Sequence, residues 1–162
     1  MAKVKDSEHA TMIVKWIEQL ESMLPRGRDL IYKTEAPCSR YYIDLVVRGK
    51  YNDYLYEFKT RFEDIGKVLR QLRRYEDSWT KEEQRRPPQT DETFHYVNSV
   101  TVLIALDTDV NRKHLKAYGK LFKDFRVGLY NLEKNEIYVL SGKKSDLFPI
   151  FEEKEEKGDW IL

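Results

Sequence analysis

The stretch between residues 41 and 60 constrains the fold more than any other part of the sequence, because it predicts two strands joined by a tight turn. Residues 41–48 and 53–60 are rich in β-branched and aromatic side chains and flank the turn-forming sequence GKYN. An even-length turn centred in GKYN sets an antiparallel register in which Asp44 lies directly opposite Glu57. Lys59 follows Glu57 by two residues and therefore shares its face of the strand. The stretch thus predicts two carboxylates and an ammonium group on one side of a sheet.

These three side chains predict a site for a divalent cation. Carboxylates on directly opposite residues have Cβ atoms about 5 Å apart and repel each other unless a positive charge lies between them. Mg²⁺, or Mn²⁺ in its place, is commonly held by carboxylates and phosphate oxygens where phosphate esters react. Lys59 can then orient the attacking water and neutralise charge on the phosphate. The alternative is an ordinary surface hairpin in which Asp44, Glu57 and Lys59 form a cross-strand ion pair.

Hydrophobic periodicity in the rest of the chain predicts an α/β or α+β domain. Segments with apolar residues at helical spacing alternate with segments rich in β-branched residues. The predicted helices span about residues 6–24, 65–79 and 110–125, and the predicted strands span about 30–35, 41–48, 53–60, 97–106, 126–132 and 136–140. Pro87 and Pro88 place a loop in the charged segment 81–93. The order α, β, β, β, α, β, α, β, β predicts a mixed sheet flanked by helices.

Length and composition restrict the architecture further. The 162 residues match one domain spanning residues 1–162, with 41% hydrophobic and 35% charged residues as in a folded protein with a charged surface. The 29 basic and 28 acidic residues give a net charge of +1, which by itself favours no polyanionic partner. One cysteine, Cys38, excludes an internal disulfide, a zinc ribbon and a four-cysteine iron-sulfur cluster. Without a signal peptide or membrane-spanning run, we expect a soluble, cytoplasmic protein.

The first predicted helix carries a histidine close to the predicted carboxylates. On a helical wheel His9 lies in the sector of Ile13 and Trp16, which faces the sheet, whereas Glu8 points roughly away from it. His9 is therefore a candidate metal ligand, although a partly buried histidine bound to a backbone carbonyl would fit the same position. Glu8 takes the place of His9 if the helix begins later.

The second predicted helix combines a polar edge with a basic face. Gln71 and Tyr75 lie along one edge of its apolar stripe, and basic residues occupy its exposed face. Amide, aromatic and guanidinium side chains suit contacts with phosphates and bases, so the helix and the following loop predict a nucleic-acid-binding surface. Each residue taken singly would also fit a solvated helix. The basic candidates are Lys67, Arg70 and Arg74 on the helix and Arg85 and Arg86 in the loop.

Together these motifs resemble a known family. An αβββαβ core with Asp44, then Glu57-Phe58-Lys59, then QLRRY from Gln71 to Tyr75 resembles the PD-(D/E)xK nucleases, and within them the RecB-like branch. The resemblance covers about residues 6–106 and leaves 107–162 as a C-terminal extension with one helix and a β-hairpin. It implies a restriction-endonuclease-like core and a metal-dependent nuclease that hydrolyses the phosphodiester bonds of DNA.

The resemblance also implies roles for individual residues. His9, Asp44, Glu57 and the carbonyl of Phe58 would bind Mg²⁺ or Mn²⁺. Asp44, Glu57 and Lys59 would be the catalytic residues, with Lys59 as the catalytic lysine. Gln71 and Tyr75 would contact DNA or brace the site. The residue before Asp44 is Ile43 and not proline, and no cysteine cluster accompanies the core, so we expect no iron-sulfur cofactor.

Two other functions fit the same motifs. One is a Holliday-junction-resolvase-like, structure-specific endonuclease, in which Glu8 and not His9 would be the ligand from the first helix. The other is a catalytically inactive nucleic-acid-binding module on the same fold. A nucleic acid is the expected partner in all three cases, with DNA favoured and RNA left open. A purely structural or assembly protein, in which the basic face of the second helix serves only solubility, is the remaining alternative. A second copy of the chain, or proteins of a recombination, repair or replication system, are further candidate partners.

Overall fold

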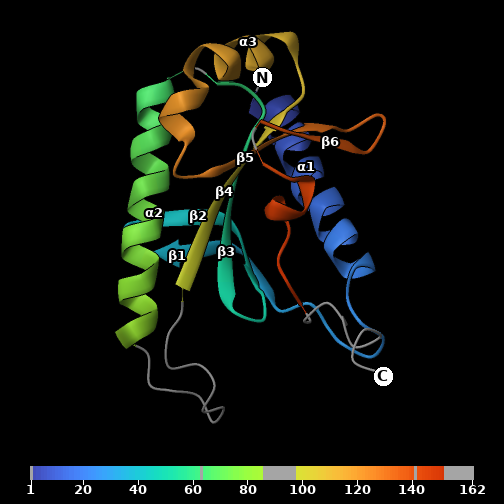
Figure 1. Ribbon diagram of the computed structural model, residues 1–162, viewed down its shortest axis with the longest axis vertical. Coiled ribbons are helices and arrows are strands. Elements are labelled where there is room, and N and C mark those ends of the chain that lie inside the picture. Colours follow the sequence, from blue (N-terminus) through green and yellow to red (C-terminus); the bar gives the residue numbers. More distant parts are fainter. Residues whose placement is uncertain (1, 63, 86–97, 141, 152–162) are drawn as a thin grey trace, which may run out of the picture.

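A six-stranded mixed sheet runs through the part of the chain that the computed structural model describes, which comprises residues 2–62, 64–85, 98–140 and 142–151 (Figure 1). The side chains of residues 2–6 and 80–85 lie outside this description. The strands are adjacent in chain order. They are β1 (Tyr32–Cys38), β2 (Tyr41–Arg48), β3 (Asn52–Lys59), β4 (Asn98–Leu106), β5 (Arg126–Asn131) and β6 (Glu136–Val139).

The direction of each strand follows from the connection that precedes it. β1, β2 and β3 form the predicted antiparallel meander, and β5 and β6 form the predicted hairpin. β3, β4 and β5 are parallel, which requires a crossover between each pair. The first crossover contains α2 (Ile65–Arg85), and the second contains α3 (Asp109–Tyr118) and the 3-10 helix η1 (Gly119–Phe122). The mixed α/β architecture predicted from the sequence is confirmed at this level.

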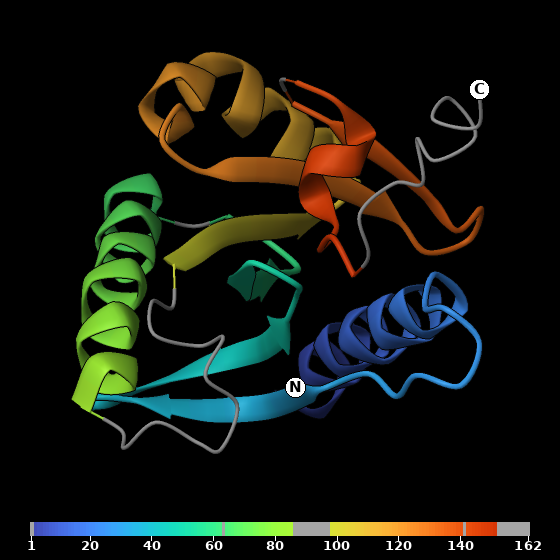
Figure 2. The ribbon, with the colours of Figure 1, turned by 60° about the horizontal axis from the view of Figure 1, so that its bottom comes forward.

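Helices cover both faces of the sheet (Figures 1 and 2). On one face, α1 (Ala2–Ser22) and the 3-10 helix η2 (Lys144–Leu147) pack against a cluster centred on Trp16. The Trp16 ring stacks on Phe148 at 4.8 Å and meets Tyr56 and Phe58 edge-on. On the other face, α2 and α3 share a second cluster that includes Leu72 and Leu115. Both faces of the central strands are therefore buried, as their apolar sequences predict.

Several predicted boundaries are wrong by a few residues. α1 begins at Ala2 and ends at Ser22, and β1 lies at Tyr32–Cys38, two to three residues later than predicted. α2 continues to Arg85, so the first five residues of the predicted loop 81–93 are helical. These residues, KEEQR, are good helix formers, and the helix ends just before Pro87 and Pro88. The rest of that loop lies outside the described residues.

The third helix is shorter than the predicted span 110–125. α3 ends at Tyr118, and η1 replaces its last predicted turns. Glycine favours such an ending, because Gly119 is a poor helix former. A Cβ atom at Gly119 would also lie 3.3 Å from the Leu140 side chain, so the glycine allows β6 and its continuation to pack closely. Among the described residues, no helix combines the length and apolar character needed to cross a membrane.

Candidate functional site

The candidate site lies where β2 and β3 part. Residues of β2 and β3 pair in the predicted register from Arg48 and Asp53 to Leu45 and Tyr56. The pairing ends one position before Asp44 and Glu57. Beyond that point the backbone N–H of Phe58 donates a hydrogen bond to Oδ2 of Asp44 at 2.9 Å. A side-chain carboxylate thus takes the place that a strand carbonyl normally fills. Asp44 and Glu57 meet at the opening of the ladder and not as a regular cross-strand pair.

The backbone of β2 rotates at Asp44. Ile43 belongs to the buried cluster with Tyr75 and Trp79 of α2, whereas Leu45 belongs to the cluster beneath α1. Residues two apart in a regular strand share a face, so the alternation is broken between them. On the neighbouring strand β1, Glu35 lies between the residues that pair with Leu45 and Ile43. Its φ of 47° is a left-handed value that few non-glycine residues adopt. The rotation turns the Asp44 side chain toward α1, whereas Glu57 contacts Tyr75 of α2. The predicted placement of both carboxylates on one side of the sheet is therefore wrong, because the regular register ends before they pair.

His9 contacts Asp44 from the α1 side of the sheet. Its Nε2 lies 3.0 Å from Oδ2 of Asp44, and the two side chains are 35% and 18% exposed. The hydrogen bond to Asp44 raises the pKa of His9 above its usual value, because the carboxylate favours the protonated ring. The predicted orientation of the helix is confirmed: His9 faces the sheet and Glu8 is exposed.

Glu57 is the buried acid of the site, with 4% of its surface exposed. Its Oε2 lies 3.3 Å from Nζ of Lys59, and its Oε1 lies 3.3 Å from the hydroxyl of Tyr75. Burial, followed by the neighbouring charge of Asp44, raises the pKa of Glu57 to about 8, and the Lys59 ammonium offsets only part of this. With no further cation nearby, the carboxyl therefore keeps its proton at neutral pH.

The Tyr75 hydroxyl joins α2 to both strands. Gln71 donates to it at 2.7 Å, and it donates to the carbonyl oxygen of Tyr42 at 2.9 Å. A hydroxyl has one hydrogen to donate, so the longer contact with Glu57 is best satisfied when the protonated carboxyl is the donor. Gln71 and Tyr75 thus brace the separated ends of β2 and β3.

The predicted basic face of α2 is exposed in the described region. Lys67, Arg70 and Arg74 all lie on the surface. Arg74 donates a hydrogen bond to the hydroxyl of Tyr41, and its guanidinium lies 5.1 Å from the centre of that ring. Arg85 is the last residue of α2, and its side chain is outside the described set. Arg86 lies outside the described residues altogether.

The donor set suits a hard divalent cation. It offers one imidazole, two carboxyl groups and the Phe58 carbonyl, and a cation between Asp44 and Glu57 would favour the deprotonated form of Glu57. The side chains meet in pairs, however. Within the described region, no three His, Cys, Asp or Glu side chains are spaced to hold a metal ion. Both the His9 contact and the Phe58 N–H contact use Oδ2 of Asp44, so neither of them engages Oδ1.

Sequence reasoning missed a second buried acid on the same strand. Asp53 accepts hydrogen bonds from Nε and Nη2 of Arg48 at 2.9 and 3.2 Å and from the indole N–H of Trp79 at 2.9 Å. Arg48 and Asp53 are directly paired in the register that the turn predicts. The signal was therefore present, since opposite charges face each other across the hairpin.

A buried asparagine of α3 was also missed. Asn111 is fully buried and donates to the carbonyls of Thr60 and Leu106 at 3.0 and 2.8 Å, while its oxygen accepts from the N–H of Phe62 at 3.1 Å. It thereby ties α3 to the ends of β3 and β4 just beyond Lys59. No pattern in the sequence marks this role.

The chain was compared with models of protein families, with curated protein sequences and with solved structures, and none of the three comparisons gave a match.

Proposed function

We propose that the chain is a metal-dependent nuclease of the PD-(D/E)xK type, of the RecB-like branch, that hydrolyses phosphodiester bonds in DNA. The observation that carries the proposal is the meeting of Asp44, Glu57 and Lys59 where β2 and β3 part. The order α1, β1, β2, β3, α2, β4 agrees with a restriction-endonuclease-like core over residues 6–106, followed by an extension over 107–162.

In this proposal Asp44, Glu57, the carbonyl of Phe58 and His9 hold Mg²⁺ or Mn²⁺. The bound ion would supply Lewis-acid activation of the phosphate and of the attacking water. The buried carboxyl of Glu57 must lose its proton to become a ligand, and its raised pKa makes that loss dependent on the arriving positive charge. His9 and Tyr75 hold the two carboxyls from opposite faces of the sheet.

Lys59 acts directly on the reacting groups. Its ammonium lies 3.3 Å from Glu57 and is partly exposed, so a phosphate at the site can reach it. There it stabilises the negative charge that develops on the phosphate and orients the water that attacks phosphorus. Lys67, Arg70 and Arg74 supply positive charge for the nucleic-acid backbone nearby.

The second candidate function is a nucleic-acid-binding module without catalysis. It is favoured by one observation, the pairwise contacts of the donor side chains, which among the described residues leave no three of them spaced for a metal ion. The resolvase-like alternative requires Glu8 as a ligand. That reading has less support, because Glu8 is exposed whereas His9 contacts Asp44.

Cleavage of labelled single-stranded and duplex DNA tests the proposal. We expect purified protein to cut DNA with Mg²⁺ or Mn²⁺ and not with EDTA, and we expect Glu57→Ala and Lys59→Ala to lose roughly 10²–10⁴-fold in rate. Glu18→Ala and Lys33→Ala, which change an exposed acid and an exposed base outside the predicted donor set, are the controls. Binding without cleavage by the folded wild type in either metal would replace the nuclease with the binding module.

A further inference from the structure

The outer side of α3 and η1 concentrates positive charge in a nearly neutral chain. Residues 109–123 contain five lysines and arginines and one acidic residue, although the whole chain carries a net charge of only +1. Lys113, Lys116 and Lys120, here called the α3 lysines, are all exposed, and none of them enters an ion pair recorded among the described residues. On the opposite side, Asn111 and Leu115 are buried. The helix is therefore fixed on one side and basic on the other.

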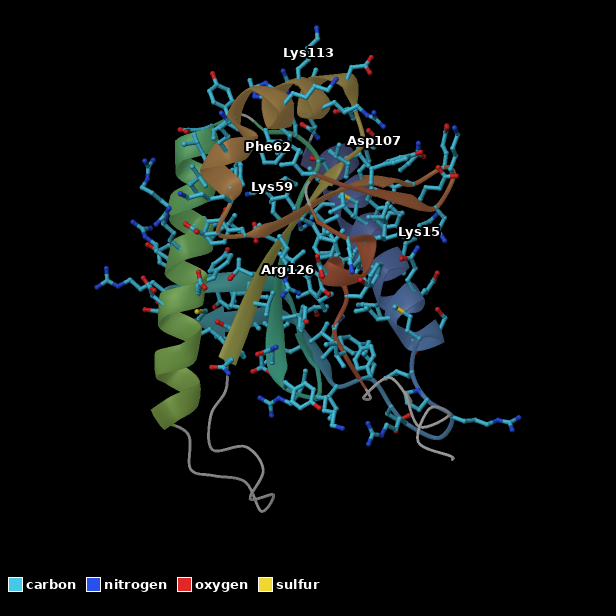
Figure 3. The ribbon with its side chains drawn as sticks, in the orientation of Figure 1. Lys15, Lys59, Phe62, Asp107, Lys113 and Arg126 are labelled. Carbon is cyan, nitrogen blue, oxygen red and sulfur yellow. The ribbon has the colours of Figure 1, made fainter. Side chains whose placement is uncertain are left out.

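The α3 lysines have a fixed position relative to the candidate site. The buried Asn111 side chain bonds to the carbonyl of Thr60 and to the N–H of Phe62, in the segment that directly follows Lys59. Figure 3 shows Lys59 and Phe62 at the end of the sheet next to α3, with Lys113 on the outer side of that helix. The α3 lysines therefore lie on a helix that is anchored to the segment directly following Lys59.

The basic surface continues onto α2. Arg73 of α2 lies 3.8 Å from Asp124 and 6.0 Å from the centre of the Phe125 ring, just after η1. The two helices also share one buried cluster, and Figure 1 shows the first turns of α2 beside α3 and η1. Lys67 and Arg70 are exposed on those turns. Positive side chains thus follow one another over two helices that flank the same end of the sheet.

We infer that the α3 lysines bind the phosphate backbone of the nucleic acid that the site acts on, and that α3 is a substrate-holding element. The inference rests on the proposed function. Lysine ammonium groups act as point charges and suit phosphates without reading base edges, so this contact is independent of sequence. A nucleic acid is the partner that fits best, because Tyr118 adds a ring, 47% exposed, of the kind that stacks on bases.

Salt dependence of binding tests the inference apart from catalysis. Fluorescence anisotropy would follow a labelled oligothymidylate of about 30 nucleotides, and a duplex of about that length, in EDTA between about 50 and 200 mM NaCl. The test variant is the triple substitution Lys113→Gln, Lys116→Gln, Lys120→Gln. The matched control changes three exposed lysines elsewhere, Lys33→Gln, Lys143→Gln, Lys144→Gln. Circular dichroism confirms that both variants fold.

We expect the test variant to bind roughly 10- to 100-fold more weakly and to lower the slope of log affinity against log salt by about 2, because each lost phosphate contact removes about 0.7–0.9. The control variant should keep the wild-type slope. Equal slopes in all three proteins, or no binding by the wild type, would overturn the inference. Lysine-dependent binding without metal-dependent cleavage would refute the nuclease and retain the binding surface. Metal-dependent cleavage together with an unchanged salt slope in the test variant would support the nuclease and refute the role of the α3 lysines.

Discussion

β3 carries two buried acids that face the same helix and differ in how their charge is balanced. Asp53 receives two hydrogen bonds from Arg48 and one from Trp79. Glu57 contacts Tyr75, which lies one turn of α2 before Trp79. Glu57 also lies beside the carboxylate of Asp44, and its ion pair is with Lys59 at 3.3 Å. Burial is nearly equal, at 2% and 4% exposed.

The comparison separates a structural acid from a chemically available one. Both oxygens of Asp53 accept hydrogen bonds, and the Arg48 guanidinium balances its charge, so this carboxylate holds the β2–β3 hairpin against α2. The pKa of Glu57 is raised, first because the carboxyl is buried and second because the Asp44 carboxylate lies beside it. Buried acids whose charge lacks a balancing partner are characteristic of functional sites.

Removing the structural acid should have the largest effect on stability. Asp53→Ala removes a buried carboxylate together with its hydrogen bonds from Arg48 and from the indole N–H of Trp79, so we expect a loss of roughly 3–4 kcal/mol in the free energy of unfolding. Urea denaturation measures the change. Glu57→Gln, which keeps the side-chain volume and an acceptor oxygen at the other acid, should not destabilise the protein at neutral pH. Equal losses in both variants would remove the distinction between the two acids.

The functional acid should make stability depend on pH. Between its ordinary pKa of 4.5 and its folded value of about 8, Glu57 binds a proton in the folded state that the unfolded chain has released. The free energy of unfolding should therefore fall as pH rises through this window, by about 1.4 kcal/mol for each pH unit that lies well inside it. In Glu57→Gln the fall should be absent. Urea denaturation of both proteins at a series of pH values measures this dependence. If the free energy of unfolding changes with pH in the same way in both proteins, the raised pKa of Glu57 is contradicted.

A divalent cation should stabilise the folded protein through Glu57 and not through Asp53. With Mg²⁺ or Mn²⁺ at about ten times its dissociation constant, we expect a gain of about 1.4 kcal/mol in the folded state. Thermal melting with matched ionic strength measures it. Glu57→Gln should lose the gain, whereas Asp53→Asn should keep it because Asp53 lies outside the donor set. A cation effect that survives in Glu57→Gln would place the binding site elsewhere.

The smallest expected effect concerns the hydroxyl that braces Glu57. Tyr75→Phe keeps the ring and removes the contacts with Gln71, Tyr42 and Glu57, which should cost about 1 kcal/mol of stability. Urea denaturation measures it. Trp79→Phe provides the comparison on the next turn of α2, since it removes the donor to Asp53 and also leaves a packing defect. Tyr75→Phe should be the milder of the two, and a larger loss there would assign Tyr75 a mainly structural role.

The order of the elements and the register of β2 and β3 could be predicted because both follow from local patterns. The alternation of apolar and polar residues and the even-length turn determine which residues of β2 and β3 pair. The helical wheel of the first helix correctly predicts that His9 faces the sheet. The same register already set Arg48 opposite Asp53, although a turn pattern cannot tell that Trp79 would complete that site.

The rotation of β2 at Asp44 could not be predicted from the strand itself. It depends on Glu35 of β1, on the approach of α1 and on the bond from the Phe58 N–H, all of which are tertiary. The end of α3 has a local signal in Gly119, whereas the close approach of Leu140 to that glycine is tertiary. Local sequence determines which side chains are available, and packing determines how they meet.

Asn111 also bears on where this protein can be divided. The residues that carry the family resemblance end near residue 106, yet the carbonyls of Thr60 and Leu106 depend on a side chain from beyond that point. A chain cut there would leave these groups without donors and would uncover Leu103, which packs in the cluster shared with α3. We therefore expect the core and the extension to form one autonomous folding unit, with a single cooperative unfolding transition.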